Sequence, residues 1–303
     1  MQAIEALNYH PNLLARGLVS KRTKIIALLY PAFSGDYLDD LQLEFIASVA
    51  NMATYFRYGL LLVTSPSGEE DIQRFIKEKL VDGLVLMEVQ VHDPRVTLMK
   101  ELGYPFSLIG HCKDNEGVSF VDLDFYTALR LGVNHLTRLK HREIAFIPRF
   151  EDFANVQHNY IIESVRGFNT TVAEMGIKGT IRGSKPSSRC GYETMMKLLD
   201  EQPGLSAVIA GNDPIYTGVI QALSERGLEV PEDFSTIGIL SQRLAERYIP
   251  KVTTITIPSD QMGRLGTEFL IRNLEGQESE PQQVILAPEL TVRQSTARYS
   301  KSL

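Results

Sequence analysis

The stretch Ala207–Gly227 reads AVIAGNDPIYTGVIQALSERG and contains one complete strand–loop–helix unit. Its first four residues are uninterrupted apolar residues, as in a strand that is buried on both faces of a sheet. Gly211, Asn212 and Asp213 end this run, and the residues from Pro214 to Arg226 then follow a helical spacing that Gly227 closes. A buried strand followed directly by a helix is the repeating unit of a parallel sheet, so this stretch predicts an α/β fold.

The same alternation of apolar runs and amphipathic segments occupies most of the chain. In the first half we predict strands at Ile25–Tyr30, Gly59–Thr64, Gly83–Met87, Pro105–Ile109 and Val118–Val121, with helices at Asp39–Tyr55, Glu69–Lys79, His92–Leu102 and Asp124–Leu139. The second half predicts strands at Glu143–Ile147, Ala207–Ala210 and Phe234–Ile239, with helices at Glu163–Glu174, Gly191–Asp200 and Pro214–Arg226. The tail predicts a strand at Thr254–Ile257, a helix at Asp260–Leu274 and one final strand at Val284–Thr291. Two successive sets of this kind indicate two doubly wound parallel-sheet lobes.

The composition is that of a globular protein and excludes several other classes. The chain has 303 residues, of which 44% are hydrophobic and 22% are charged, and its net charge is −6. No apolar run is long enough to span a bilayer, and the first residues lack the apolar core of a secretory signal, so we expect a cytoplasmic protein. Cys112 and Cys190 match no metal or redox spacing and are expected to be free thiols.

The first 24 residues carry a local basic segment that contrasts with the acidic whole. Pro11 suits the first turn of a helix, and Leu14 and Leu18 would share one face of it. Such a short helix is not stable alone. With Arg16, Lys21, Arg22 and Lys24 to neutralise phosphates, it could be ordered by DNA and could insert a leucine into the minor groove. The alternative is a solvated N-terminal tail.

Several motifs resemble those of LacI-type transcriptional regulators. The segment Asn8–Leu18, followed by a basic linker and an apolar strand, is similar to the hinge of that family, and Ala207–Gly227 and Leu290–Thr296 fit its order further along the chain. The resemblance covers nearly the whole sequence in register. It implies an effector-binding domain of the periplasmic-binding-protein-like type I fold, whose helix-turn-helix head is missing from this sequence. It also implies that the hinge contacts DNA through Asn12, Ala15, Arg16 and Leu18, with Leu18 as the intercalating residue.

The resemblance also implies a division of the chain into parts. Residues 1–23 would form the end of the DNA-binding head, the hinge helix and the linker. Residues 24–140 and 258–276 would form the N-terminal lobe, and residues 141–257 and 281–297 the C-terminal lobe, with a first crossover near Lys140 and His141. The family property of three crossings between lobes is an expectation that the residues do not themselves show.

Candidate binding residues follow the predicted strands, because ligands of parallel sheets bind at the carboxyl ends of strands. This rule selects Glu88, His111, Arg149, Asn212 and Asp213. For Asp213 we weigh capping of the next helix and ligand binding equally, whereas for Asn212 we favour ligand binding, since the family commonly places this pair at the effector. By the same resemblance Tyr37 faces the effector, and loop packing is its alternative role.

The sequence departs from the family pattern at two charged positions. The family usually has an arginine three residues before the glycine of a Gly–aromatic pair, but here Ser164 stands at that spacing before Gly167 and Phe168. The family also often has an aspartate after the Ile-Gly strand end, where this chain has Leu240 and Ser241. Either another charge substitutes, or the ligand is less polar than usual, or the cleft binds no ligand.

No enzyme motif is present. The sequence lacks a phosphate-binding loop, a dinucleotide fingerprint, a zinc-protease helix and a nucleophile elbow, and its histidines have no metal-ligand spacing. The resemblance implies a ligand-responsive regulator, most simply a repressor, that binds a sugar or related metabolite between its lobes and controls operator binding through the hinge. It would be a homodimer without cofactor, metal or membrane contact, and a protein co-regulator is a further candidate partner. The alternative is a solute-binding protein of a transporter, which shares the two lobes.

Overall fold

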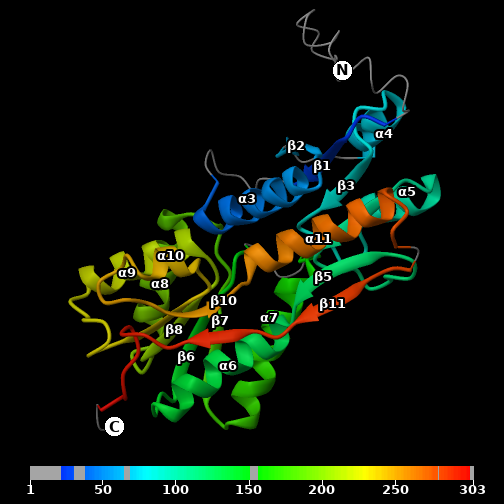
Figure 1. Cartoon of the computed structure of the whole chain (residues 1–303). Coiled ribbons are helices and arrows are strands. Elements are labelled where there is room, and N and C mark those ends of the chain that lie inside the picture. The colour runs from blue at the N-terminus through cyan, green and yellow to red at the C-terminus, as the bar shows by residue number, and fades with distance from the viewer. Residues whose placement is uncertain (1–21, 31–37, 65–68, 151–155, 279, 301–303) are drawn as a thin grey trace, which may run out of the picture.

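The structure is a computed structural model, and it describes residues 22–30, 38–64, 69–150, 156–278 and 280–300. The predicted hinge residues Asn12, Ala15, Arg16 and Leu18, and the predicted site residue Tyr37, lie outside the described residues. Two six-stranded sheets, each covered by helices, form two lobes that lie end to end (Figure 1). The prediction of two doubly wound α/β lobes is confirmed.

The first sheet has the strand order β11-β5-β4-β3-β1-β2, and all of its pairs are parallel. Its strands are β1 (Ile25–Leu29), β2 (Gly59–Val63), β3 (Gly83–Leu86), β4 (Phe106–Ile109), β5 (Ser119–Leu123) and β11 (Gln283–Leu286). Helices α3 (Asp40–Tyr55) and α11 (Ser259–Leu274) share one hydrophobic core with this sheet, and α4 (Glu69–Lys77) and α5 (Pro94–Leu102) share the other. Strands buried on both faces explain the uninterrupted apolar runs.

The second sheet has the order β12-β10-β9-β8-β6-β7, in which only the β10–β12 pair is antiparallel. Its strands are β6 (Glu143–Ile147), β7 (Lys178–Ile181), β8 (Ala207–Ala210), β9 (Ser235–Gly238), β10 (Thr253–Thr256) and β12 (Glu289–Thr291). One core lies beneath α8 (Ser188–Glu201), α9 (Asp213–Glu225) and α10 (Gln242–Ala245). The other lies beneath α6 (Phe125–Arg138) and α7 (Asn159–Glu174).

The first crossover differs from the prediction. The buried face of α6, which includes Leu129, Val133 and Leu136, belongs to a core of the second sheet. At Gly132 an added Cβ would lie 3.0 Å from Ile209, so this helix packs closely on that sheet. The chain therefore leaves the first lobe at Asp124, before α6, and the predicted boundary near Lys140 and His141 is wrong.

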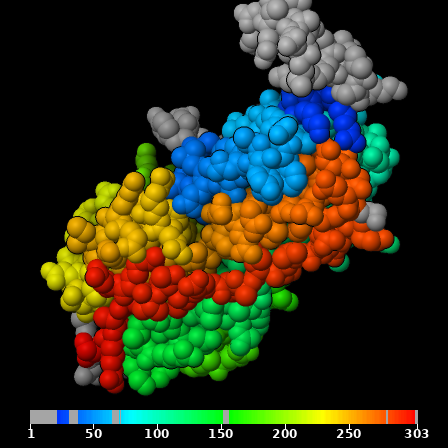
Figure 2. Space-filling view, viewed as in Figure 1, coloured from blue at the N-terminus to red at the C-terminus, as the bar shows by residue number. Residues whose placement is uncertain are grey.

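The last crossover also differs, because the predicted final strand is two strands. β11 pairs with β5 in the first sheet, and β12 pairs with β10 in the second. Pro288 lies between them, and a residue without an amide hydrogen cannot continue a ladder, so the pairing stops there. Residues 281–297 are thus shared by both lobes and do not all belong to the C-terminal one. In Figure 2 this segment (red) runs along both lobes.

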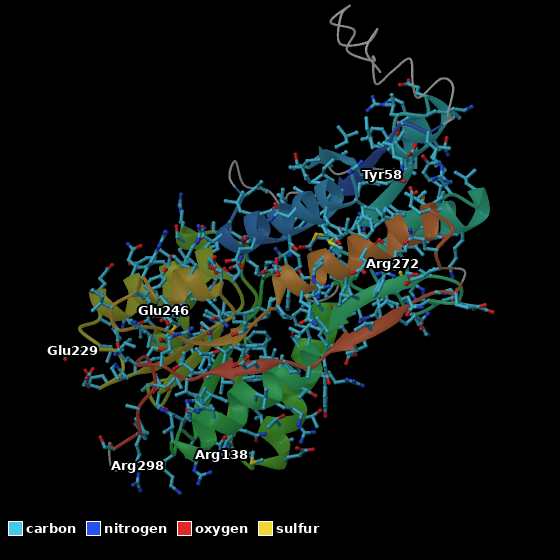
Figure 3. The ribbon with its side chains drawn as sticks, viewed as in Figure 1. Tyr58, Arg138, Glu229, Glu246, Arg272 and Arg298 are labelled. Carbon is cyan, nitrogen blue, oxygen red and sulfur yellow. The ribbon has the colours of Figure 1, made fainter. Side chains whose placement is uncertain are left out.

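The start of the described chain is tied to the end of α11. The Glu275 carboxylate, next after α11, accepts hydrogen bonds from Lys24 Nζ at 2.7 Å and Tyr58 Oη at 2.5 Å, and Arg22 lies 3.3 Å away. Asp82 accepts from the backbone amides of Thr23 and Lys24 at 2.7 and 2.9 Å. Tyr58 lies beside β1 at this end of the lobe (Figure 3). The linker before β1 is therefore anchored to both the sheet and the returning helix.

Candidate ligand-binding cleft

A cavity of about 110 Å³ lies where the carboxyl ends of the two parallel sheets face each other. Residues that directly follow β1, β3 and β4 line it from the first lobe, and residues that follow β6, β8 and β9 line it from the second; they are Tyr30, Met87–Val89, Gly110, His111, Pro148, Arg149, Gly211, Asn212 and Ile239. Further walls come from α3 and α7. This is the position at which open parallel sheets bind ligands.

The centre of the cavity holds an ion pair between the lobes. Arg149 donates to a carboxylate oxygen of Glu88, and its Nε and Nη2 atoms lie 3.0 and 2.6 Å from the hydroxyl of Tyr160. Both charged side chains are nearly buried, 12% exposed for Arg149 and 7% for Glu88. Burial alone would lower the pKa of Arg149, but the adjacent Glu88 carboxylate outweighs it and raises that pKa.

Glu88 is held in a strained backbone conformation, with φ of 52°. A non-glycine residue in this region costs about 1–3 kcal/mol and persists only where its surroundings require it. Here the turn directly after β3 directs the carboxylate between the lobes. Its second oxygen, Oε2, is buried and has no hydrogen-bond partner in the described part of the chain. Glu88 therefore presents a free acceptor at the cavity.

A second contact between the lobes involves His111. Its Nδ1 lies 2.7 Å from the Asp122 carboxylate, and its Nε2 lies 2.9 Å from the side-chain amide of Asn159 on α7. The ring also stacks on Phe120 at a centroid distance of 5.4 Å. Asp122 therefore holds the imidazole of His111. Asp124, two residues further on, instead caps α6 by accepting a hydrogen bond from the amide of Thr127.

Asn212 caps α9 and also faces the cavity. Its Oδ1 accepts from the Ile215 amide at 3.1 Å, so its Nδ2 points away from the helix. Nδ2 is buried and has no hydrogen-bond partner among the described residues. The preceding Gly211 lets the backbone approach β6, since a Cβ there would lie 2.9 Å from the carbonyl oxygen of Ile147. The capping role weighed for Asp213 therefore belongs to Asn212, and that alternative is wrong.

Asp213 is buried behind the cavity wall. It is 6% exposed, and neither carboxyl oxygen has a hydrogen-bond partner within the described ranges. Burial first, and then the charges of Asp39, Asp40 and Glu44 on α3, raise the pKa of Asp213 to about 8, while the nearby backbone of Ser241 lowers it only in part. Asp213 thus faces acidic residues of the opposite lobe.

The structure brings most of the predicted site residues together. Glu88, His111, Arg149, Ser164 and Asn212 line one cavity, whereas Asp213, the residue after Asn212, is buried and is not among the lining residues. Ser164 does not replace the missing arginine chemically, because its hydroxyl donates to the Tyr160 carbonyl oxygen at 2.7 Å.

The sequence did not single out Asp39, Asn159 and Tyr160 as site residues. The sequence pattern predicts Asp39 only as the start of a helix. The structure shows that α7 begins four residues earlier than the pattern predicts, so the predicted helix does not include Asn159 and Tyr160. A shift of four residues corresponds to one more helical turn, which carries Asn159 and Tyr160 into the cavity wall.

Two other classes of site are absent from the part of the chain that the structure describes. No group of three or more His, Cys, Asp and Glu side chains is arranged to hold a metal ion. None of the helices found there has the length and apolar character needed to cross a membrane. Cys112 and Cys190 are free, as predicted.

Comparison with known proteins places this cleft in a family. The family described as "Periplasmic binding protein-like domain" matches residues 133–296. The HTH-type transcriptional regulator RegA of Clostridium saccharobutylicum is 29% identical over 98% of this chain and 89% of its own length, and the catabolite control protein A of Priestia megaterium is 26% identical over the same shares. The solved structure of the transcriptional regulator CelR–cellobiose complex superposes with a TM-score of 0.81 at 25% identity, over 97% of this chain and 88% of that one.

The alternating units, the two sheets with a cavity between their strand ends and these relatives agree with one another. The chain belongs to the periplasmic binding protein-like family and, within it, to the LacI-type transcriptional regulators.

Proposed function

We propose that this protein is a ligand-responsive transcriptional repressor whose effector binds in the cavity between the lobes. The observation that supports this is the pair of buried, unpartnered polar atoms on its walls, the acceptor Glu88 Oε2 from the first lobe and the donor Asn212 Nδ2 from the second. Leaving a buried polar atom without a partner costs about 1–3 kcal/mol. A hydroxylated molecule that supplies both partners would therefore stabilise the closed arrangement of the lobes.

The sugar class of effector is supported by a relative and by the cavity walls. CelR was solved as a cellobiose complex. The cavity here combines polar atoms with apolar side chains such as Phe45, Met87 and Phe125, which suits the mixed surface of a sugar ring. We infer a sugar or related metabolite, acting in the cytoplasm on a homodimer that binds operator DNA through the hinge and the head that the family resemblance implies.

The lobes would couple ligand and DNA through a shift between two arrangements. The ion pair Glu88–Arg149 and the His111–Asn159 contact join the lobes directly in the arrangement seen here. A ligand changes DNA affinity only to the extent that it binds one arrangement better than the other. The linker anchored by Glu275 and Asp82 would carry the difference to the hinge.

A thermal-shift screen against sugars, nucleosides and small acids tests the proposal. A ligand at one hundred times its Kd should stabilise by about 2.7 kcal/mol. Asn212→Ser keeps an oxygen to cap α9 but removes the amide donor, so it should weaken binding while the variant stays folded. Asn273→Ser, on the exposed side of α11, is the matched control and should bind normally.

The same ligand should change the affinity of the full-length protein for operator DNA, measured by fluorescence anisotropy. A blank screen, or a ligand that binds equally well to Asn212→Ser, would contradict an effector site in this cavity. Binding of a protein co-regulator instead would be the alternative outcome.

A further inference from the structure

The charges on the cavity wall do not balance. Three carboxylates line it, those of Asp39, Glu88 and Asp122, whereas Arg149 is the one arginine or lysine on the wall as described. Glu88 forms an ion pair with Arg149, and Asp122 has a hydrogen-bond partner in His111. Asp39 uses one oxygen to cap α3 through the Gln42 amide and forms no ion pair with a described residue. Asp39 is therefore left without an ion-pair partner of its own. Burial raises its pKa, and Arg149, which lowers that pKa from a distance, is already paired with Glu88.

Asp213 adds a second uncompensated carboxyl beside Asp39. It follows the cavity residue Asn212 in the chain, and the Asp39 charge acts on it directly. Its two oxygens have no hydrogen-bond partner in the described ranges, although the residue is more than nine-tenths buried. The backbone of Ser241 approaches this carboxyl but lowers its pKa only in part, so the buried oxygens keep acceptor capacity for a further partner.

The neighbouring groups do not neutralise these carboxyls. Asp40 lies 3.1 Å from Arg243, and Glu44 accepts a hydrogen bond from Ser259, so both have their own partners. Tyr248, the other titratable group that interacts with Asp213, is uncharged at neutral pH and bonds to Thr217. The first turns of α3 and α9 contribute only about half a positive charge each.

The segments that follow β1 and β6 in the chain add no cationic residue by sequence. The segments 31–37 and 151–155, which follow β1 and β6, read PAFSGDY and EDFAN and contain no lysine, arginine or histidine. The position where the family resemblance implies an arginine is Ser164. The chain thus lacks both the arginine and the aspartate that the family resemblance implies, while Asp39, Glu88 and Asp122 remain on the cavity wall.

We propose that the effector carries a protonated amine in addition to hydroxyl groups, and that Asp39 and Asp213 bind this amine. The proposal rests on the function proposed above and names its ligand class. The ammonium would donate hydrogen bonds to the free oxygens of both carboxyls, and the hydroxyls would meet Glu88 Oε2 and Asn212 Nδ2. Neutral sugars would leave Asp213 unpartnered, and phosphorylated sugars would be repelled by the surplus carboxylates.

Binding of the amine should release a proton. Without ligand Asp213 is largely protonated at pH 7, because its pKa is about 8. An ammonium beside it favours the carboxylate, so the carboxyl proton passes to the buffer while the ammonium keeps its own. A neutral sugar makes no such change. Proton release therefore distinguishes an amine bound at Asp213 from an amine bound elsewhere in the cavity.

Matched sugars test the proposal at pH 7 by calorimetry. Glucose, galactose and mannose are each compared with their 2-amino and 6-phosphate derivatives, alongside the broader screen above. We expect an amino compound to bind at least tenfold more tightly than its neutral parent and to release a proton, seen as a binding enthalpy that depends on the buffer. Asp213→Asn should reduce the preference below threefold and abolish the release, whereas Asp114→Asn, an exposed carboxyl paired with Lys100, should retain both.

Each other result overturns a defined part of the argument. If a neutral or phosphorylated compound binds as tightly as the amine, the amine site is wrong and the proposed function stands. If Asp213→Asn keeps the preference, the amine is not bound by Asp213. If no compound in either screen binds, the amine site and the proposed function fail together.

Discussion

The two lobes contribute opposite chemistry to the cleft. The first lobe supplies carboxylates, with Glu88 and Asp122 near strand ends and Asp39 just before α3 on the cavity wall, and Asp40 beside them in the first turn of α3. The second supplies donors, which are Arg149, Asn159, Asn212 and Arg243. Closure therefore joins acceptors to donors across most of the interface.

Asp213 is the exception to this division. It is a carboxyl on the donor lobe, and it faces the carboxylates of α3. The lobes thus attract each other at Glu88–Arg149 and Asp40–Arg243, whereas the carboxylates of α3 oppose the ionisation of Asp213 and repel it once it is ionised. The arrangement of the lobes therefore depends on both attractive and repulsive charge interactions. A ligand that compensates the repulsive ones would favour the closed arrangement.

The largest effect should come from breaking the central pair. Arg149→Met removes the cation and leaves Glu88 buried and uncompensated, so the free energy of unfolding should fall by about 3–5 kcal/mol in urea titrations. Combining it with Glu88→Gln removes the orphan charge and should restore most of that loss. A double variant no more stable than Arg149→Met would show that packing of the arginine, and not charge pairing, holds the lobes together.

A smaller effect on the free energy of unfolding should follow from replacing Asp213. The pKa of Asp213 in the folded protein, about 8, exceeds that of an unfolded aspartate, about 4. Between these values the folded state holds a proton that the unfolded state lacks, so the free energy of unfolding should fall as pH rises, by at most about 1.4 kcal/mol per pH unit from this group. Asp213→Asn should flatten that fall between pH 5 and pH 8. An unchanged pH profile would mean that Asp213 does not oppose closure.

The smallest effect should come from the exposed pair at the edge. The Arg243 side chain is 56% exposed and lies 3.1 Å from Asp40, where α10 and the start of α11 meet α3 (Figure 2). Exposed ion pairs contribute about 0–1 kcal/mol, and salt screens them. Arg243→Ala should lower the free energy of unfolding by less than 1 kcal/mol, and the difference should vanish at 0.5 M NaCl. If Arg243→Ala lowered the free energy of unfolding as much as Arg149→Met, the exposed pair would be as important for stability as the buried pair, contrary to the prediction.

The sequence predicted elements well where the signal was local. β6 and β8 begin and end as predicted, because β8 is an uninterrupted apolar run and β6 is apolar from Ile144 onward. β7 was missed because Lys178–Ile181 begins with a lysine and contains a glycine at the edge of its sheet, and α10 was missed because four residues show no helical period.

What the sequence could not predict depends on contacts distant in the chain. The amphipathic pattern of α6 would be the same on either sheet, so only packing shows that it belongs to the second lobe. Glu88 and Arg149 were both selected by the strand-end rule, but their pairing joins residues 61 positions apart and leaves no local trace. The burial of Asp213 against α3 likewise requires the lobes to be placed together.

Helix α11 connects the cavity wall to the anchored linker before β1. Met262 in its first turn lines the cavity, and Glu275 at its far end holds Lys24 at the start of the described chain. These residues are 13 positions apart along one continuous helix, or about 20 Å at 1.5 Å per residue. A helix transmits axial displacement as a stiff rod. A shift of the cavity wall at Met262 would therefore be carried along α11 to the residues before β1.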